Sequence, residues 1–261
     1  MEKSNINEKI KLLTGSGMWH TQEVEGLPPV HLSDGPHGLR KQEEKERQNN
    51  VSLVSTCYPT ASALACSWDV TAAERLGRAV AKEAWNADVA VLLGPGINMK
   101  RSPLCGRNFE YFSEDPFLAG RLGAAYVSAA QSEGVAVSLK HFAANNQETN
   151  RQTANSQIDE RALREIYLSA FEYVVKTARP ATIMASYNRL NGYYACENRH
   201  LLTEILREEW GFDGVVISDW GACADLAKAV KAGMDLEMPD SHGIHARKLK
   251  AALKAGEISE A

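Results

Sequence analysis

The chain has 261 residues, of which 44% are hydrophobic and 24% charged, and its formal net charge is −4 at pH 7. This composition is typical of a globular protein with one large domain or two small ones, and its acidic balance excludes a basic surface for nucleic acid or membranes. No apolar run reaches the length of a membrane span, and charges interrupt the first fifteen residues where a signal peptide needs an apolar stretch, so we expect a cytoplasmic protein.

Apolar runs rich in β-branched residues alternate with longer stretches of helical periodicity along the chain. This alternation is typical of βα units repeated around a parallel sheet. The expected strands, in chain order, are 28–32, 61–65, 89–93, 135–139, 181–186, 214–218 and 234–238. The expected helices are 71–85, 116–131, 159–176, 200–210 and 223–233, followed by a last one that begins at residue 244.

Seven strands with helices between them predict an α/β fold of the TIM-like barrel type, in which side chains at the C-terminal strand ends form the site. A doubly wound open sheet is the alternative, but such a sheet normally carries a G-x-G-x-x-G phosphate loop after its first strand. Gly94-Pro95-Gly96 follows an expected strand but lacks the third glycine. No domain boundary is visible, so we expect residues 1–261 to form one barrel domain that is incomplete or irregular at its ends.

The pattern of cysteines and histidines predicts neither a metal nor another cofactor. The five cysteines are scattered and form no C-x-x-C pair, which argues against a disulfide framework and a structural zinc site. His242 and His245 have H-x-x-H spacing without a supporting carboxylate pattern, and we interpret them as surface residues. The polar run 41–50 has nearly balanced charges and is interpreted as a solvated loop, with a lid over a cleft as the alternative.

Charged or polar side chains follow nearly every apolar run. Each alone has a structural interpretation: Asp34 as a turn residue, Arg107 as an ion-pair partner, Lys140 as the counter-charge of a carboxylate. Together, on one face of a barrel, they favour a pocket for a ligand with many hydroxyl groups, which need both donors and acceptors. The residues at these positions are Asp34, Arg107, Glu110, Lys140, His141, Tyr187, Asn188, Asp219, Trp220 and Glu237.

A series of longer motifs extends from about residue 27 to residue 240. They are SDGPHGLR, YPTASALACSWD, LLGPGINMKRSPLCGRNFEYFSEDP, KHFAANNQETNR, DERALREIYLSAFE, MASYNRLNG, LLTEILREEWGFDG, VVISDWGA and GMDLEMP. In this order, the motifs resemble the catalytic barrel of glycoside hydrolase family 3, which includes many bacterial β-glucosidases. The resemblance implies a hydrolase that acts on β-glucosides or short oligosaccharides and removes their terminal non-reducing β-D-glucosyl residues.

The resemblance also implies a role for individual residues. The aspartate of S-D-W, here Asp219, is the catalytic nucleophile in the family. The substrate-binding positions are Asp34, Arg107, Lys140 and His141, which hold sugar hydroxyls, Arg151 and Tyr187, which line the same subsite, and Trp220, which borders the leaving group. A retaining glycosidase attacks the anomeric carbon with one carboxylate, so the nucleophile must be ionised. We expect nearby cations such as Lys140 or Arg151 to hold the pKa of Asp219 low.

The second carboxyl group of the mechanism has no evident residue in this sequence. Two-domain members of the family supply it as a glutamate from an α/β sandwich domain after the barrel, and a single-domain branch uses an Asp-His pair in the loop after Lys-His. Here that loop reads KHFAANNQETNR, and nothing in the resemblance marks Glu148 as the acid. We therefore expect a fragment or half of a split enzyme, impaired alone, whose acid/base carboxylate comes from a separate domain or chain.

Two other functions are compatible with the residues alone. One is a sugar-binding pseudoenzyme of the same lineage, which keeps the pocket without turnover. The other is a Schiff-base aldolase or lyase that uses Lys140 at its strand end as the nucleophile. The sequence leaves the sugar open among glucose, xylose and N-acetylglucosamine, and it leaves the aglycone and the oligomeric state open as well.

Overall fold

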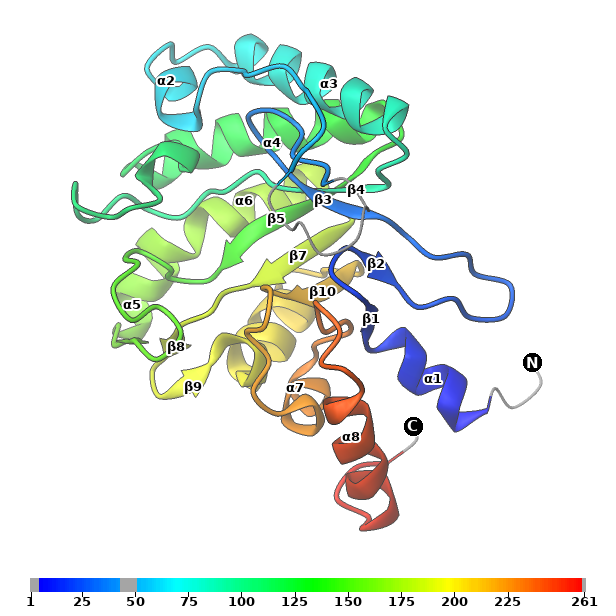
Figure 1. Cartoon of the computed structure of the whole chain (residues 1–261). Coiled ribbons are helices and arrows are strands. Elements are labelled where there is room, and N and C mark those ends of the chain that lie inside the picture. The colour runs from blue at the N-terminus through cyan, green and yellow to red at the C-terminus, as the bar shows by residue number, and fades with distance from the viewer. Residues whose placement is uncertain (1–4, 43–50, 260–261) are drawn as a thin grey trace.

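The structure is a computed structural model that describes residues 5–42 and 51–259 (Figure 1). Its helices are α1 (Ile6–Leu12), α2 (Ala61–Ala65), α3 (Val70–Asn86), η1 (Asn108–Glu110), α4 (Pro116–Ser132), α5 (Glu160–Ala162), η2 (Leu163–Tyr167), α6 (Ser169–Ala178), η3 (Ala195–Glu197), η4 (His200–Glu209), α7 (Leu226–Ala232) and α8 (Ile244–Lys254). Its strands are β1 (Gly15–Ser16), β2 (His20–Thr21), β3 (Leu32–Asp34), β4 (Val91–Leu93), β5 (Ala136–Phe142), β6 (Asn155–Ser156), β7 (Thr182–Ala185), β8 (Arg189–Leu190), β9 (Tyr193–Tyr194) and β10 (Val215–Ser218).

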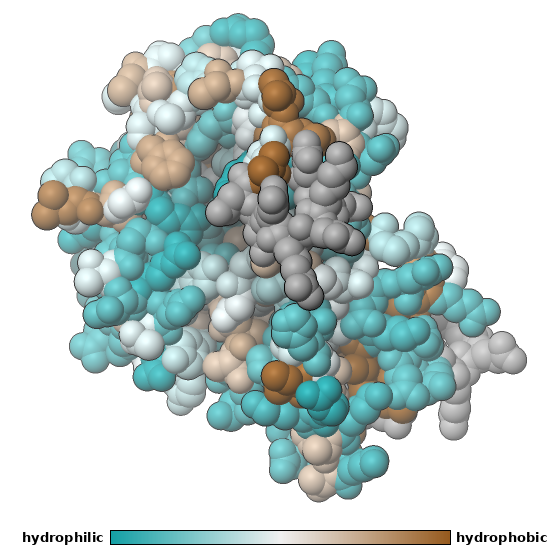
Figure 2. Space-filling view, in the orientation of Figure 1, coloured by the Kyte–Doolittle hydropathy of each residue, from teal (hydrophilic) through white to brown (hydrophobic). Residues whose placement is uncertain are grey.

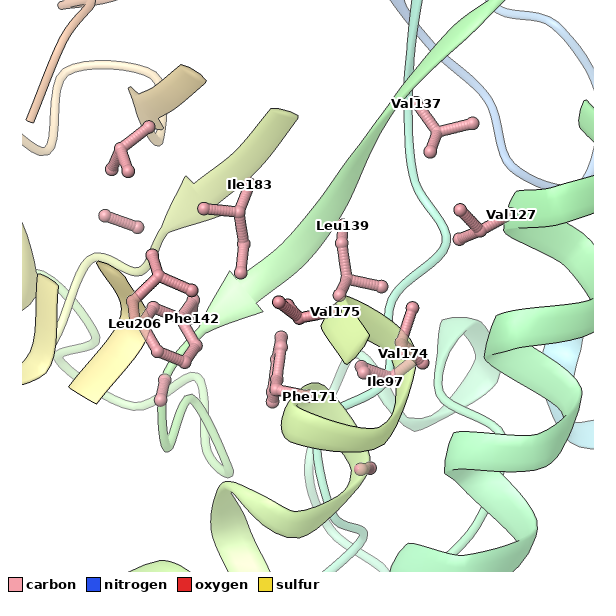
Figure 3. Packing of buried hydrophobic residues seen from close by; sticks show 14 of the residues in the cluster. Ile97, Val127, Val137, Leu139, Phe142, Phe171, Val174, Val175, Ile183 and Leu206 are labelled. Carbon is pink, nitrogen blue, oxygen red and sulfur yellow. The ribbon is translucent and has the colours of Figure 1, made fainter. Parts of the chain in front are cut away.

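Five parallel strands form the central sheet in the order β10-β7-β5-β4-β3. Helices α3, α4 and α6 pack on one another along one side of this sheet, as Figure 1 shows. The main hydrophobic core lies between these helices and the sheet, where Leu139 of β5 and Ile183 of β7 face Phe171 and Val174 of α6 (Figure 3). Parallel strands with helical crossovers confirm the α/β fold.

Short contacts outside the five-stranded sheet close it into a barrel-like ring. Leu236 lies parallel to Ile217 of β10, and its neighbour Glu237 pairs with Thr14. From Thr14 the chain enters the antiparallel pair β1 and β2, and His20 of β2 bridges back to His31 beside β3. The N-terminal segment thus joins the two edges of the sheet. The barrel is irregular, because its closing strands are only one or two residues long.

A second, smaller hydrophobic cluster fills the inside of this ring. Strands β3, β4, β7 and β10 contribute to it, and successive side chains of a strand point to opposite faces of the sheet. In β4, for example, Val91 and Leu93 belong to the inner cluster while Leu92 belongs to the outer core. The inner cluster comprises Leu32, Val91, Leu93, Met184, Ile217, Leu236 and Met238. Apolar side chains of the described residues therefore fill the interior of the ring.

Two expected strands are wrong. Residues 61–65 form helix α2, because the Thr60 hydroxyl accepts the Ala63 N–H at 3.3 Å as an N-cap and alanine favours helices. A short apolar run has the same composition in a buried helix as in a strand, so periodicity cannot separate them. Residues 234–238 do not form a strand. Within them, Leu236 and Glu237 make only the single bridges to Ile217 and Thr14 described above.

The remaining expected elements are present with shifted ends. The expected helix 159–176 is divided into α5, the π-helical η2 and α6, and the expected helix 200–210 is the π-helical η4. Most of the polar run 41–50 lies outside the described residues. No helix among the described residues is long and apolar enough to cross a membrane, and the face shown in Figure 2 is mainly hydrophilic with scattered apolar side chains.

Candidate active site

Asp219 lies at the C-terminal end of β10, one residue after the strand ends. Its backbone N–H donates to the Ala185 carbonyl at 2.9 Å, which continues the pairing with β7 beyond the strand. Its Oδ1 accepts the Trp220 N–H at 2.7 Å. The other oxygen, Oδ2, is buried without a hydrogen-bond partner in the described part of the chain and lies 3.8 Å from His141 Nε2. One carboxylate oxygen is therefore fixed and the other is free to react.

The ionisation of Asp219 differs from the sequence-based expectation. Burial raises the pKa of Asp219, and Arg107, Lys140, the Trp220 N–H and Arg151 offset this only in part, so the net shift is upward. The expected low pKa is wrong, because the side chain is almost fully buried and desolvation of the charge outweighs the attraction of the cations.

This upward shift predicts that Asp219→Asn raises thermal stability at pH 7. A folded-state pKa above the unfolded value means that the folded protein binds the proton more tightly, so stability is lost as pH rises from the ordinary value of 3.8 through the raised one. Asparagine is neutral throughout and avoids that loss. Melting curves at pH 7 and pH 3 should show a gain in Tm for the variant at pH 7 that shrinks towards zero at pH 3.

A matched control for this measurement is Asp213→Asn. The Asp213 side chain is 77% exposed and pairs with Arg179 on the surface, so its neutralisation should change Tm little at either pH. If Asp219→Asn instead melts below the wild type, by the same amount at pH 7 and at pH 3, then burial does not raise the pKa of Asp219 more than the nearby cations lower it.

Lys140 of β5 and Asp34 of β3 come from the two strands on either side of β4 and meet at the C-terminal edge of the sheet. Lys140 belongs to β5, its side chain is only 4% exposed, and its Nζ lies 3.4 Å from Asp34 Oδ1 and 3.8 Å from Glu110 Oε2. Glu110 also accepts a very short hydrogen bond from Arg107 Nε. Buried charges need such pairing to be tolerated. These contacts form a chain of alternating charges, Asp34, Lys140, Glu110 and Arg107, at the C-terminal edge of the sheet.

His141 is buried and neutral. Burial lowers the pKa of His141 well below its usual value, and the charges of Arg107 and Lys140 lower it further. Arg107 Nη2 lies 2.7 Å from Nε2, and Tyr111 Oη lies 2.9 Å from Nδ1. Since an arginine can only donate, Nε2 is the acceptor and Nδ1 carries the proton. His141 therefore orients Arg107 at the same time as it lines the cavity.

Arg151 and Tyr187 form a stacked pair at another wall. The Arg151 guanidinium lies 4.3 Å from the centre of the Tyr187 ring, and Tyr187 Oη donates to the Trp220 carbonyl at 2.8 Å. Glu148 accepts a hydrogen bond from Arg151 Nη1 at 2.8 Å and another from Asn145 Nδ2 at 3.3 Å. Glu148 is thus committed to holding the 145–151 loop together.

Two tryptophans stand at the edge of the cavity. The Trp220 ring lies 5.3 Å from that of Trp19, and its Nε1 donates to the Met18 carbonyl at 2.8 Å. Trp19 Nε1 in turn donates to Gln42 Oε1 at 3.0 Å. The sequence-based analysis missed Trp19, because it lies between β1 and β2, far along the chain from the other site residues.

The eight predicted site residues converge on one cavity of about 230 Å³. Six come from the C-terminal ends of β3, β5, β7 and β10 or from the first two residues after them, and Arg107 and Arg151 come from loops. Trp19 and Met184 complete the lining. The full set is Trp19, Asp34, Arg107, Lys140, His141, Arg151, Met184, Tyr187, Asp219 and Trp220. The structure thus brings together Asp219 and the seven predicted substrate-binding residues, whereas Glu110, Asn188 and Glu237, which also follow apolar runs, do not line this cavity.

A group of three side chains with metal-ligating atoms does not line this cavity. Donor atoms of Cys223, Glu237 and His245 lie within 4.8 Å of one another. Glu237 and His245 form a very short ion pair, and the His245 side chain is only 15% exposed. The interpretation of His245 as a surface residue is therefore wrong. The ion pair joins Glu237, in the segment that closes the ring, to His245 of α8. This structural contact explains why the two side chains lie together.

Comparison with known proteins places the site in a family. A sequence model described as the N-terminal domain of glycosyl hydrolase family 3 matches residues 39–261. The chain belongs to this family. The resemblance of its motifs is confirmed, and so is the TIM-like barrel, since solved β-glucosidases of the family share the fold over nearly the whole chain.

Several relatives of this family 3 barrel are similar over most of its length. It is 53% identical to the thermostable β-glucosidase B of Acetivibrio thermocellus over all of this chain and 35% of the relative. It is 51% identical to an exo-α-(1→6)-L-arabinopyranosidase of Bifidobacterium longum over 91% of this chain and 32% of the relative. The β-glucosidase 3B of Thermotoga neapolitana, solved with α-D-glucose, superposes with a TM-score of 0.93 and 41% identity over 98% of this chain and 39% of that one.

The family 3 chain therefore spans about a third of the length of the curated relatives it matches. Within that third, Asp219 and the seven residues predicted to bind substrate all line one cavity.

Proposed function

We propose that the chain is the nucleophile-bearing barrel of a retaining glycosidase that removes terminal non-reducing β-D-glucosyl residues. The observation that carries this proposal is the free, buried Oδ2 of Asp219, which faces a cavity lined by charged and aromatic side chains. Residues 1–261 as a single barrel domain and a cytoplasmic location remain predictions.

In the proposed mechanism, Asp219 Oδ2 attacks the anomeric carbon and forms a glycosyl ester while the aglycone leaves. The hydrogen bond from the Trp220 N–H to Oδ1 holds the carboxylate plane, so the attack needs little reorganisation. The cations Arg107, Lys140 and Arg151 favour the ionised carboxylate that the attack requires. Water then hydrolyses the ester, which restores Asp219 and retains the configuration of the sugar.

The charged groups around the cavity are suited to hold the glycone. Asp34 accepts hydrogen bonds from hydroxyls, while Lys140 and Arg107 donate to them, and charged partners make these bonds stronger than neutral ones. The two tryptophans at the edge offer flat apolar faces to the aglycone or to a second sugar ring. Lys140, paired with two carboxylates, acts as a binding cation in this scheme, and nothing in the comparisons supports an aldolase or a pseudoenzyme.

The acid/base carboxyl group is proposed to come from outside the described residues. Asp34 and Asp219 are the carboxylates lining the cavity within residues 5–42 and 51–259, and Asp34 is bound to Lys140. Glu148 is held by Arg151 and Asn145. In this proposal a separate domain or chain donates the proton to the leaving group.

The sugar itself is part of the proposal. Relatives of nearly equal identity carry the names β-glucosidase and exo-α-(1→6)-L-arabinopyranosidase. α-L-Arabinopyranose is the β-D-galactose ring without its hydroxymethyl group, so these two names differ in the glycone at C4 and C6 only. We take β-D-glucosides as the substrate class.

Covalent trapping tests the proposed nucleophile. A dinitrophenyl 2-deoxy-2-fluoro-β-D-glucoside forms the glycosyl ester without needing an acid, and the fluorine slows its hydrolysis. Mass spectrometry of the digested protein should place one fluoroglucosyl group on the peptide that contains Asp219. A label found reproducibly on another carboxylate would overturn the assignment.

Substitutions Arg107→Ala and Lys140→Ala should each lower kcat/KM for a dinitrophenyl β-D-glucoside by roughly 10- to 150-fold. Each removes a charged hydrogen bond worth about 1.5–3 kcal/mol, and bonds to ring hydroxyls tighten in the oxocarbenium-like transition state. Lys176→Ala is the matched control, because Lys176 forms an exposed surface pair with Glu172. Near wild-type kcat/KM in both cavity variants would place the sugar elsewhere.

A further inference from the structure

A second cavity adjoins the Asp219 cavity and shares charged residues with it. Its volume is about 340 Å³, and it shares Asp34, Arg107 and Lys140 with the nucleophile cavity. Its other walls come from the loop 35–40 and from residues of the 107–110 segment. The sequence-based analysis assigned no ligand to this space, although the loop is part of the SDGPHGLR motif. Because the two cavities share three walls, a ligand seated at Asp219 would extend towards the second one.

His37 has no partner in this second cavity. Both of its ring nitrogens are buried without a hydrogen bond to any described residue, and the centre of its ring lies 6.3 Å from that of Phe109, with the two ring planes inclined by 66°. An unpaired buried polar group costs about 1–3 kcal/mol, and here two such atoms occur on one side chain. A ligand hydroxyl would supply a partner.

The backbone holds His37 in place before any ligand arrives. Gly35 and Gly38 adopt φ values of +120° and +147°, and a Cβ on Gly35 would lie 2.1 Å from the Gly38 carbonyl oxygen. Only glycine tolerates this conformation and this closeness. The Tyr58 N–H donates to the His37 carbonyl at 2.8 Å. The turn is thus a rigid support for the imidazole rather than a loop that forms on binding.

The ring of His37 is neutral at ordinary pH. Burial lowers the pKa of His37 to about 4; the charge of Glu110 acts in the opposite direction, and Lys140 adds to the lowering. A neutral imidazole offers one donor and one acceptor, which matches the two functions of a hydroxyl group. It also adds no positive charge beside Arg107 and Lys140.

We propose that His37 is a specificity-determining residue whose ring hydrogen-bonds a hydroxyl at the C4–C6 end of the glycone, inside the cavity it shares with Asp34 and Lys140. This inference rests on the proposed function, which puts C1 at Asp219. In a pyranose, C4 lies across the ring from C1, and the hydroxymethyl group extends beyond the ring near it. These are the parts of the sugar that point from Asp219 past Asp34 and Lys140. The neutral ring then distinguishes sugars by their C4 hydroxyl and hydroxymethyl groups.

The test compares His37→Phe with the wild type on four dinitrophenyl β-glycosides. These are the glucoside, the 4-deoxyglucoside, the 6-deoxyglucoside and the xyloside, and kcat/KM is measured for each with the full chain. Phenylalanine keeps the ring beside Phe109 but removes both nitrogens, while His37→Gln keeps a donor and an acceptor. We expect the preference for glucoside over at least one deoxy sugar to fall about 10-fold in the Phe variant, with partial recovery in the Gln variant.

The design separates the hydrogen bond from a general structural effect. A sugar that lacks the partner hydroxyl should lose nothing further from His37→Phe, as in a double-mutant cycle. If the Phe variant lowers kcat/KM equally for all four glycosides, or changes none, the proposed contact is wrong. Should Phe impair folding, judged by Tm, the Gln variant and His37→Asn carry the same comparison.

Binding measurements distinguish failure of this inference from failure of the proposed function. Calorimetry or saturation-transfer NMR with glucose, 4-deoxyglucose and 6-deoxyglucose requires no turnover. If no glycoside is hydrolysed but the wild type discriminates these sugars and His37→Phe does not, His37 reads the sugar and the catalytic proposal fails. If hydrolysis and trapping at Asp219 succeed while His37→Phe discriminates as the wild type does, only the role of His37 fails.

Discussion

Asp219→Asn is expected to lower kcat/KM for a dinitrophenyl β-D-glucoside by on the order of 10⁴-fold or more. The side chain keeps its size and can keep the hydrogen bond from the Trp220 N–H, but it loses the anionic oxygen that attacks C1. Binding of glucose, measured by calorimetry, should change far less than the rate, because Arg107, Lys140 and Asp34 remain. The substitution should thus impair the chemical step far more than sugar binding.

Chemical rescue makes this prediction specific to a nucleophile. In Asp219→Ala, azide can occupy the space of the missing carboxylate and attack the same face of the sugar. The product should be α-glucosyl azide, identified by NMR. Asp213→Asn, the exposed control, should keep wild-type kinetics. Full activity in Asp219→Asn, or a loss that azide does not relieve in Asp219→Ala, would count against the assignment.

The second large effect concerns the leaving group. The isolated 261-residue chain should release dinitrophenolate slowly but measurably from its glucoside, and almost no glucose from cellobiose. Dinitrophenolate leaves without a proton, whereas a sugar alkoxide needs a general acid, whose contribution is on the order of 10²–10⁴-fold. Of the carboxylates that line the described cavity, Asp34 is paired with Lys140 and Asp219 is the proposed nucleophile, so neither is assigned as the general acid.

Two additions should restore part of the turnover. A domain or chain that carries the acid should raise cellobiose hydrolysis when it is added in trans. Azide should accelerate the dinitrophenyl reaction by attacking the glycosyl ester on Asp219, and the product here should be β-glucosyl azide, the opposite anomer to the one expected with Asp219→Ala. Efficient cellobiose hydrolysis by the chain alone, abolished by Glu148→Gln, would show that the acid is internal.

The α/β class and eight of the ten residues that line the Asp219 cavity could be predicted from the sequence. The alternation of apolar runs with helical stretches is a local property, because hydrophobic periodicity reflects which face of each element is buried. Lys140 and Asp219 could be assigned to one site because each directly follows an apolar run, and the C-terminal ends of parallel strands lie on one face of a barrel. The motif order then carried the family, which the profile match over residues 39–261 confirmed.

The closure of the ring and the contacts that depend on it are visible only in the tertiary structure. The apolar run 61–65 became a helix through the Thr60 cap, and Thr14 closed the barrel against Glu237, a contact between opposite ends of the chain that no local pattern contains. Trp19 reached Trp220 through the same closure.

The electrostatics of the site depended on tertiary structure for the same reason. The pKa of Asp219 rises because burial outweighs the charges of Arg107 and Lys140, and the balance depends on distances and solvent exclusion that the sequence does not record. Burial also lowers the pKa of His37, whose ring nitrogens have no hydrogen-bond partner among the described residues. Sequence patterns identify which groups are present, whereas their desolvation and mutual distances arise only when segments far apart along the chain pack together.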